Sequence, residues 1–195
     1  MNQRISTFLL SLLALSLTAT HLPGAEITED TPENLFSNGS FETAGKTEAA
    51  AAGWEAAGYQ PAIRTQEKAF DGTFSMKMSG DGERPYGLRQ LIPGAKLQGK
   101  KKLEVTACFY YENDLKGHFF PIFFIVAADG KQFWPPSRVR RNSDPKEKWF
   151  KAGATLDLTK YTSIKHVEIY TLGWKYGGKH FSGTAYIDNF EAFAE

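Results

Sequence analysis

The chain has 195 residues, with 23 Lys and Arg against 22 Asp and Glu, and a formal net charge of +1. This near-neutral balance argues against nucleic acid as a partner, because nucleic-acid binding favours a strong basic excess. Cys108 is the only cysteine, which excludes an intrachain disulfide. Its apolar and aromatic surroundings indicate a buried, unreactive thiol.

Residues 1–25 have the pattern of a secretory signal peptide. Arg4 precedes an apolar run that is interrupted only by Ser and Thr. The run is shorter than the roughly 20 apolar residues that span a bilayer, which favours a cleaved signal over a membrane anchor. We therefore predict a secreted or periplasmic protein whose mature chain is not inserted in a membrane.

The mature chain is predicted to form one domain. Removal of residues 1–25 leaves 170 residues, the usual size of one compact domain. Residues 26–33 are polar and acidic, which predicts a flexible leader before a domain at 34–195. The Ala-rich stretch 49–52 ends at Gly53 without an amphipathic repeat, so we predict a loop there.

Strand patterns recur between Gly, Pro, Asn and Asp residues along the rest of the chain. The strands are predicted at 62–66, 73–78, 86–92, 102–112, 119–127, 149–157, 163–172 and 182–193. No segment carries apolar residues at helical spacing for long enough to form a convincing helix. The order predicts an all-β fold, a sandwich or barrel.

The side-chain alternation of two predicted strands, 102–112 and 163–172, indicates a polar and aromatic outer face. The odd-numbered residues from Leu103 to Tyr111 are predicted to face the core, which turns Tyr110 and Glu112 to the other side. In 163–172, Val167 and Ile169 share one face. The opposite face carries His166, Glu168 and Tyr170.

The stretch 119–126 is apolar on both faces, which predicts a strand covered on both sides. Pro121 cannot donate a ladder hydrogen bond, so we expect it near the start of the strand or at a bulge. Asp129 and Gly130 suit the positive φ angles of a tight hairpin turn.

Several segments resemble the carbohydrate-binding modules of the family 4/9 (CenC-like) group, in the galactose-binding-like jelly-roll superfamily. The segments are NLFSNGSFE at 34–42 with Gly53-Trp54, AFDGTFSMK at 69–77, Arg89-Gln90 before Ile92-Pro93-Gly94, Trp149, and GTAYIDNF at 183–190. The resemblance implies an antiparallel two-sheet jelly-roll β-sandwich with its first and last strands together, and non-catalytic binding of a polysaccharide. The segment 94–100 departs from the family pattern.

The resemblance also implies a structural Ca²⁺ ion. Glu42 and Asp188 stand where similar modules bind calcium, and carboxylates are the hard oxygen ligands that Ca²⁺ prefers. Carbonyl groups around Ser40 and Gly72 are the expected additional ligands. The alternative is that the two carboxylates accept hydrogen bonds from turn amides.

A glycan site needs exposed aromatic rings beside directional polar groups. Trp54 and Trp149 match family positions that pack internally, so they are predicted in the core. Trp134, Trp174 and Tyr176 lie in loop contexts and are candidate platforms, with partial burial as the alternative.

The second candidate location is a cleft on the concave sheet face. Its predicted lining is Tyr110, Glu112, His166, Glu168 and Tyr170, joined by Arg89 or Gln90. Tyr can stack on a sugar ring, while Glu and His can bind its hydroxyl groups. The alternative is an ordinary solvated sheet face without a ligand.

Two other functions stay open. A jelly-roll polysaccharide lyase would use Arg89, Tyr110, His166 and Tyr170 around one uronate, and Glu112 with Glu168 are conceivable glycosidase carboxylates. A protein-binding adhesive sandwich would use the exposed aromatic residues instead. Modules of this kind commonly accompany glycoside hydrolases, so two arrangements are expected: the protein acts alone as a glycan binder, or in an assembly with a separate glycan-degrading enzyme.

Overall fold

The computed structural model describes residues 32–57, 60–83, 86–174 and 181–195. The predicted signal peptide and the leader up to residue 31 lie outside the described residues. The strands are β1 (Glu55–Ala56), β2 (Gln60–Pro61), β3 (Ile63–Thr65), β4 (Ser75–Asp81), β5 (Tyr86–Pro93), β6 (Lys102–Tyr111), β7 (His118–Ala128), β8 (Lys131–Phe133), β9 (Trp149–Asp157), β10 (His166–Trp174) and β11 (Ser182–Ala194). Two short 3-10 helices, η1 (Gly94–Leu97) and η2 (Leu158–Lys160), lie in the connections.

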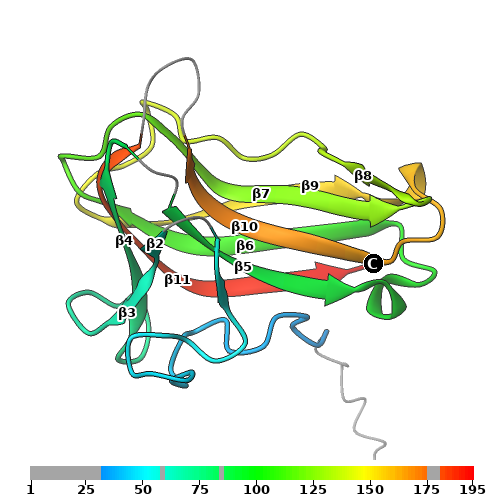
Figure 1. Ribbon diagram of the computed structural model, residues 1–195, viewed down its shortest axis with the longest axis horizontal. Coiled ribbons are helices and arrows are strands. Elements are labelled where there is room, and N and C mark those ends of the chain that lie inside the picture. The colour runs from blue at the N-terminus through cyan, green and yellow to red at the C-terminus, as the bar shows by residue number, and fades with distance from the viewer. Residues whose placement is uncertain (1–31, 58–59, 84–85, 175–180) are drawn as a thin grey trace, which may run out of the picture. The chain divides into compact units, whose positions relative to one another are not determined.

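The strands form two sheets that pack face to face as a β-sandwich (Figure 1). The first sheet has the order β1-β5-β10-β7-β8, and β2 pairs with β5. The second has the order β3-β4-β11-β6-β9. All pairs are antiparallel except β2 with β5. The predicted all-β two-sheet sandwich and its eight strands are confirmed, whereas β1, β2 and β8 are too short to leave a sequence pattern.

The core lies between the two sheets and follows the alternation of the strands. In β6 the predicted inner residues from Leu103 to Tyr111 are all fully buried, and in β10 so are Val167 and Ile169. Cys108 is also buried, and burial raises the pKa of its thiol to about 11, which keeps it unreactive. Among the described residues, no helix is long and apolar enough to cross a membrane.

The two ends of the domain are joined, as the resemblance implies. The side chain of Asn34 donates to Phe190 O (3.0 Å) and accepts from Ala192 N (2.9 Å), so it ties the first segment to β11. Trp54 is in the core as predicted, where its ring lies 5.0 Å from that of Phe190. The loop predicted around 49–52 is confirmed, with one isolated bridge between Ala44 and Ala51.

The prediction that β7 is covered on both sides is wrong. Tyr170 and Leu172 of β10 pair with Phe123 and Phe120 of β7. One residue separates the first two and two residues separate the second two, so β7 carries one extra residue at this point. Pro121 lies in this bulge, as expected. Because of the extra residue, Phe120 and Phe123 both turn to the outer face, where they are only partly buried. The hairpin after β7 is confirmed, with Asp129 and Gly130 at φ 54° and 72°.

Trp149 is also placed differently from the prediction, because it is not in the core between the sheets. Its cross-strand partner is Tyr110, on the outer side of β6, and its ring contacts those of Tyr110 (5.7 Å) and Phe70 (5.9 Å). Trp149 therefore lies on the outer face of the second sheet.

Candidate functional site

One row of side chains crosses the outer face of the first sheet. Glu55 of β1 pairs with Arg89 of β5, Arg89 pairs with Tyr170 of β10, and Tyr170 pairs with Phe123 of β7. Directly paired residues point to the same face of a sheet. Their neighbours Leu88, Ile169 and Phe124 are buried on the other face, so these four side chains point outward.

Trp134, just after β8, extends this row at the edge of the sheet. Its ring lies 5.7 Å from that of Phe123, which lies 6.2 Å from that of Tyr170, both edge to face. Phe120 packs at 5.5 Å from Phe123 beside the row. We call Glu55, Arg89, Tyr170, Phe123 and Trp134 the transverse row. Across β1, β5, β10 and β7 it spans three strand spacings, or about 14 Å.

The polar end of the transverse row is held by Arg89. Its Nε and Nη2 donate to Glu55 Oε2 (3.0 and 2.8 Å), and its Nη1 donates to Glu168 Oε2 and Tyr170 Oη (both 3.2 Å). Glu168 also accepts a hydrogen bond from Tyr170 Oη and lies 3.2 Å from Nε2 of His166. The predicted residues Arg89, His166, Glu168 and Tyr170 are thus brought together in one cluster.

The cluster sets the charge of its members. Burial acts to raise the pKa of Glu168, but hydrogen bonds from Tyr170 and His166 and the charge of Arg89 lower it overall. Burial and the hydrogen bond to Glu168 raise the pKa of the Tyr170 hydroxyl. Near neutral pH the cluster therefore presents an anionic carboxylate and a neutral phenol beside a cationic guanidinium.

A hollow of about 320 Å³ opens beside this cluster, lined by Ser37, Gly53, Glu55, Arg89, Gln90, Leu91 and Glu168. Gln90 is itself turned inward, where Ser37 N donates to its Oε1 at 2.8 Å. Of the two residues proposed to join the cleft, Arg89 thus points to the outer face of the sheet, and Gln90 fixes the wall of the hollow.

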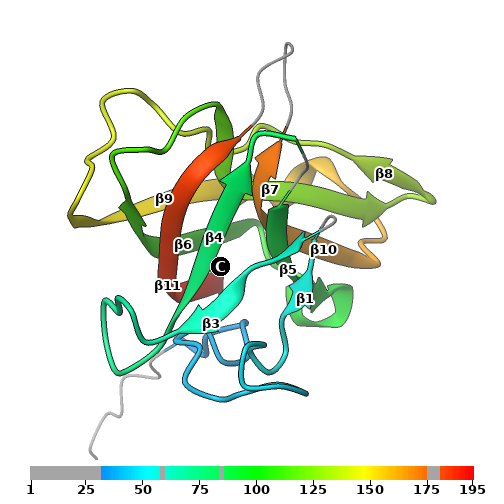
Figure 2. The same cartoon turned by 60° about the vertical axis from the view of Figure 1, so that its left-hand side comes forward.

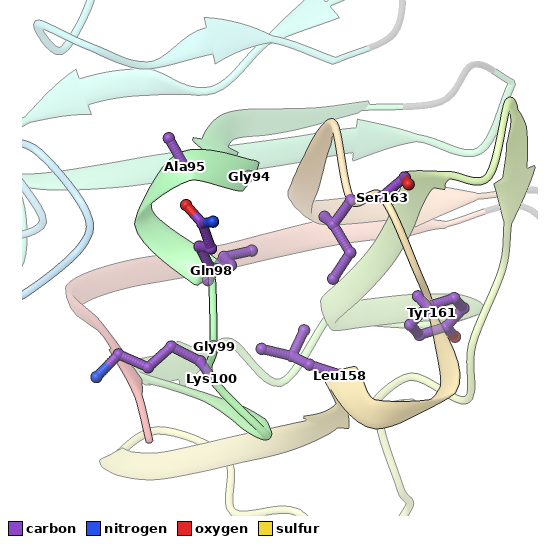
Figure 3. Close-up of a pocket in the computed structure, with 10 residues that line it drawn as sticks. Gly94, Ala95, Gln98, Gly99, Lys100, Leu158, Tyr161 and Ser163 are labelled. Atoms are coloured by element: carbon purple, nitrogen blue, oxygen red, sulfur yellow. The ribbon is translucent and has the colours of Figure 1, made fainter.

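A second hollow, of about 400 Å³, lies at the end of the sandwich between η1 and η2 (Figure 3). Gln98, Lys100, Tyr161 and Ser163 lie around it, together with glycine and aliphatic residues. None of the residues predicted to bind a ligand lines it. Tyr161 is the one aromatic residue in this lining, and it is partly buried and packs against Phe133 at 5.2 Å, so this hollow lacks the exposed aromatic surface of the transverse row.

Two residues of the predicted cleft are not part of this site. Tyr110 lies in β6 of the second sheet and Glu112 directly follows that strand, and the core separates the outer face of the second sheet from that of the first. The alternation placed both side chains outward correctly, but it carries no information about which sheet a strand joins. The glycosidase pair of Glu112 and Glu168 is excluded for the same reason.

The structure places the three predicted aromatic platform residues differently. Trp134 is 63% exposed and lies in the transverse row. Trp174 is the last residue of β10, paired with His118, rather than a loop residue. Its side chain and the whole of Tyr176 lie outside the described residues. Sequence reasoning missed Glu55, Phe120 and Phe123. The two-sided apolar pattern of β7 was the available signal for the phenylalanines.

The predicted calcium ligands, Glu42 and Asp188, both bind one loop. Glu42 Oε1 accepts from the amides of Thr73 and Phe74 (both 2.9 Å), and Asp188 Oδ2 accepts from Phe70 N at 2.8 Å. Asp188 is fully buried, and burial together with the charge of Glu42 raises its pKa to about 6, although amide hydrogen bonds act to lower it. No group of three or more His, Cys, Asp or Glu side chains suited to a metal is present among the described residues.

The backbone on either side of these carboxylates is constrained. Phe41, just before Glu42, and Asn189, just after Asp188, have φ angles of 59° and 48°, in the left-handed region that non-glycine residues seldom adopt. Gly72 lies so close that an added Cβ would be 2.5 Å from Glu42 Oε1. The local chain is therefore shaped around the two carboxylates.

No protein-family model and no curated protein matches the chain. Solved structures do. The C-terminal family 22 carbohydrate-binding module of Clostridium thermocellum Xyn10B is 11% identical with a TM-score of 0.58, over 84% of this chain and 96% of that chain. The module TmCBM61, in complex with β-1,4-galactotriose, is 17% identical with a TM-score of 0.53, over 84% and 99%.

These identities are low and show the fold alone. The protein has the β-sandwich fold of carbohydrate-binding modules of families 22, 61 and 16, and the finer assignment to the family 4/9 group stays a prediction. The enzymatically active domain of bacteriophage CBA120 tailspike protein 4 also matches, at 12% identity and a TM-score of 0.53, over 83% of this chain and 21% of that chain. Fold alone therefore does not separate binding from catalysis.

Proposed function

We propose that this protein is an exported, non-catalytic module that binds a polysaccharide or oligosaccharide along the transverse row. The observation that carries the proposal is the continuity of the row, with Trp134, Phe123 and Tyr170 in ring contact and Arg89 next in register. Aromatic rings offer surfaces for the C–H faces of sugars, and the Arg89 cluster offers donors and acceptors for hydroxyl groups. The pattern of residues 1–25 supports export.

The charge of the site favours an uncharged glycan. Arg89 is shared by two carboxylates, Glu55 at 2.8 Å and Glu168 at 3.2 Å, so its positive charge is already matched and gives little attraction to an acidic sugar. Xylan and β-1,4-galactan are the first ligands to test. The reason is that a matched module from Paenibacillus barcinonensis Xyn10C is described as xylan-binding, and TmCBM61 was solved with β-1,4-galactotriose.

A polysaccharide lyase is the second candidate, because Arg89, His166 and Tyr170 converge as such an enzyme requires. The electrostatics of these residues argue against a lyase. A general base works best with a pKa near the operating pH, whereas the pKa of Tyr170 is raised above its ordinary value. The two carboxylates on Arg89 would also repel the uronate group that a lyase must bind and neutralise.

The carboxylates Glu42 and Asp188 are proposed to hold a structural Ca²⁺ ion. Their oxygens are hard donors, and neither carboxylate forms a salt bridge among the described residues. Backbone carbonyls and water would complete the roughly six to eight oxygen ligands that Ca²⁺ takes. Such an ion would offset the repulsion between the buried Asp188 and the exposed Glu42 and fix the loop that both carboxylates bind. Capping of the loop amides alone is the alternative.

The test uses the mature protein, residues 26–195, with xylan, β-1,4-galactan and a wider panel of plant, algal and host polysaccharides. We expect saturable binding by calorimetry that is weakened by Trp134→Ala, with neither reducing ends nor unsaturated products after prolonged incubation. Release of unsaturated products that Tyr170→Phe abolishes would establish the lyase. Failure to bind any member of the panel would contradict a glycan-binding function.

A further inference from the structure

The outer face of the second sheet carries its own row of paired residues. Ile63, Lys77, Tyr186, Tyr110 and Trp149 are directly paired in that order across β3, β4, β11, β6 and β9. The rings are in contact, with Tyr110 at 5.7 Å from Trp149 and 6.0 Å from Tyr186. We call these five residues the opposite row. The proposed function makes no use of it.

The loop between β3 and β4, residues 66–74, covers one part of the opposite row and leaves another open; its course can be followed in Figure 2. Glu67 accepts from Tyr186 Oη at 2.8 Å, and Tyr186 is only 4% exposed. At the other end Phe70 packs against Trp149 at 5.9 Å and remains 49% exposed. The accessible part therefore comprises the exposed Phe70 with the partly buried Trp149 and Tyr110.

Two charged side chains, those of Lys68 and Glu112, lie beside the accessible part of the opposite row. Lys68 Nζ lies 4.5 Å above the centre of the Tyr110 ring and 3.4 Å from Glu112. Their side chains are 34% and 27% exposed, so both reach solvent. An aromatic ring with an adjoining ion pair is the same combination that Tyr170, Arg89 and Glu168 form on the first sheet.

The charges around the opposite row cancel in pairs. Besides Lys68 with Glu112, Lys77 pairs with Glu67 at 2.7 Å and Lys151 with Glu191 at 2.6 Å. A balanced surface gives no attraction to an anionic polymer. Phe70 is exposed, whereas Trp149 and Tyr110 are partly buried, so the apolar area here is small beside the roughly 1,000 Å² that a stable protein interface buries. Uncharged sugar, with apolar ring faces and hydroxyl groups, is the ligand that fits both properties.

We propose that Phe70, Trp149 and Tyr110, with Lys68 and Glu112, form a second binding site for an uncharged glycan. The inference rests on the proposed function. Because the two sites lie on opposite faces of the sandwich, one short oligosaccharide cannot occupy both. A protein with two such sites links separate polysaccharide chains, and gains avidity on a surface where chains lie close together.

The experiment is calorimetric titration of the mature protein with xylo-oligosaccharides and β-1,4-galacto-oligosaccharides. The wild type is expected to bind two molecules per chain, and Trp149→Ala and Trp134→Ala are each expected to weaken a different one of the two sites. Phe70→Ser, a change in an exposed loop residue, is expected to weaken the second site without loss of fold, checked by circular dichroism. Light scattering with soluble xylan or galactan should show cross-linking by the wild type and none by either Trp variant.

The outcomes separate this inference from the proposed function. One molecule bound per chain, lost in Trp134→Ala and unchanged in Trp149→Ala and Phe70→Ser, would leave the proposed function intact and refute the second site. A dimer that Phe70→Ser dissociates, with one sugar bound per chain, would assign this face to a second copy of the protein and also refute it. Absence of binding in the wild type would refute both.

Discussion

Replacement of Trp134 by Ala tests the transverse row most directly. The side chain is 63% exposed, and a Trp offers up to about 250 Å², so about 160 Å² of it is accessible to a ligand. A sugar ring stacked on one side would cover about half of that area, roughly 80 Å². At about 25 cal/mol per Å² this burial contributes about 2 kcal/mol, which corresponds to a change in Kd of about 30-fold.

The assay is calorimetric titration of wild type and Trp134→Ala with the tightest-binding glycan of the panel, with unfolding in denaturant measured in parallel. Stability should change by less than about 0.5 kcal/mol, because the side chain is mostly exposed. Ile63→Ala is the matched control, since Ile63 is 51% exposed on the other sheet and should leave Kd unchanged. A Kd for Trp134→Ala within threefold of wild type would refute the stacking role of this residue.

Four further outcomes are expected. Tyr170→Phe keeps the ring but removes the hydroxyl that bonds Glu168 and Arg89, so calorimetry should show Kd weakened by about tenfold, a loss of about 1.4 kcal/mol; an unchanged Kd would contradict the polar role. The pKa of Glu168 lies below its ordinary value of 4.5, so its contribution to stability is fully present above that pH and is lost as the pH falls through the lowered pKa. Denaturant unfolding of Glu168→Gln should show a weaker acid dependence than wild type, and equal slopes would argue against the ion pair. Phe109→Ala, at a fully buried position, should lower the free energy of unfolding by about 3–5 kcal/mol in urea, whereas a loss below about 1 kcal/mol would contradict the described core. Calcium should raise and EDTA lower the Tm of the wild type, and Glu42→Gln should lose this response; a Tm insensitive to both reagents would leave the carboxylates as amide caps.

Alternation within one strand was the most reliable source of prediction. It placed Leu103, Val105 and Val167 in the core and turned Tyr110 and Tyr170 outward, because the side-chain period of a strand is independent of its neighbours. The Asp129-Gly130 turn was predictable for a similar local reason, since Asp-Gly accommodates positive φ angles at little cost.

Predicting which residues form the site requires the pairing and order of the strands, which the sequence of one strand does not contain. Tyr110 and Tyr170 look alike in their own strands, yet β6 and β10 join different sheets. Phe123 looked buried because its stretch is apolar on both faces, and only the bulge at Pro121 shows that two of its phenylalanines face outward together. Trp149 was predicted in the core because it matches a family position that packs internally, but its ring contacts the exposed Phe70.

The register that builds the transverse row is stabilised by the core beneath it. If β10 slipped by one residue against β5 and β7, Val167 and Ile169 would move to the outer face and His166, Glu168 and Tyr170 would become buried. Burying those polar groups without partners costs several kcal/mol. The buried inner residues therefore fix the register that aligns the outer ones. Substitutions at outer positions of the row should therefore change glycan affinity at nearly constant stability. Substitutions at inner positions should reduce stability and binding together.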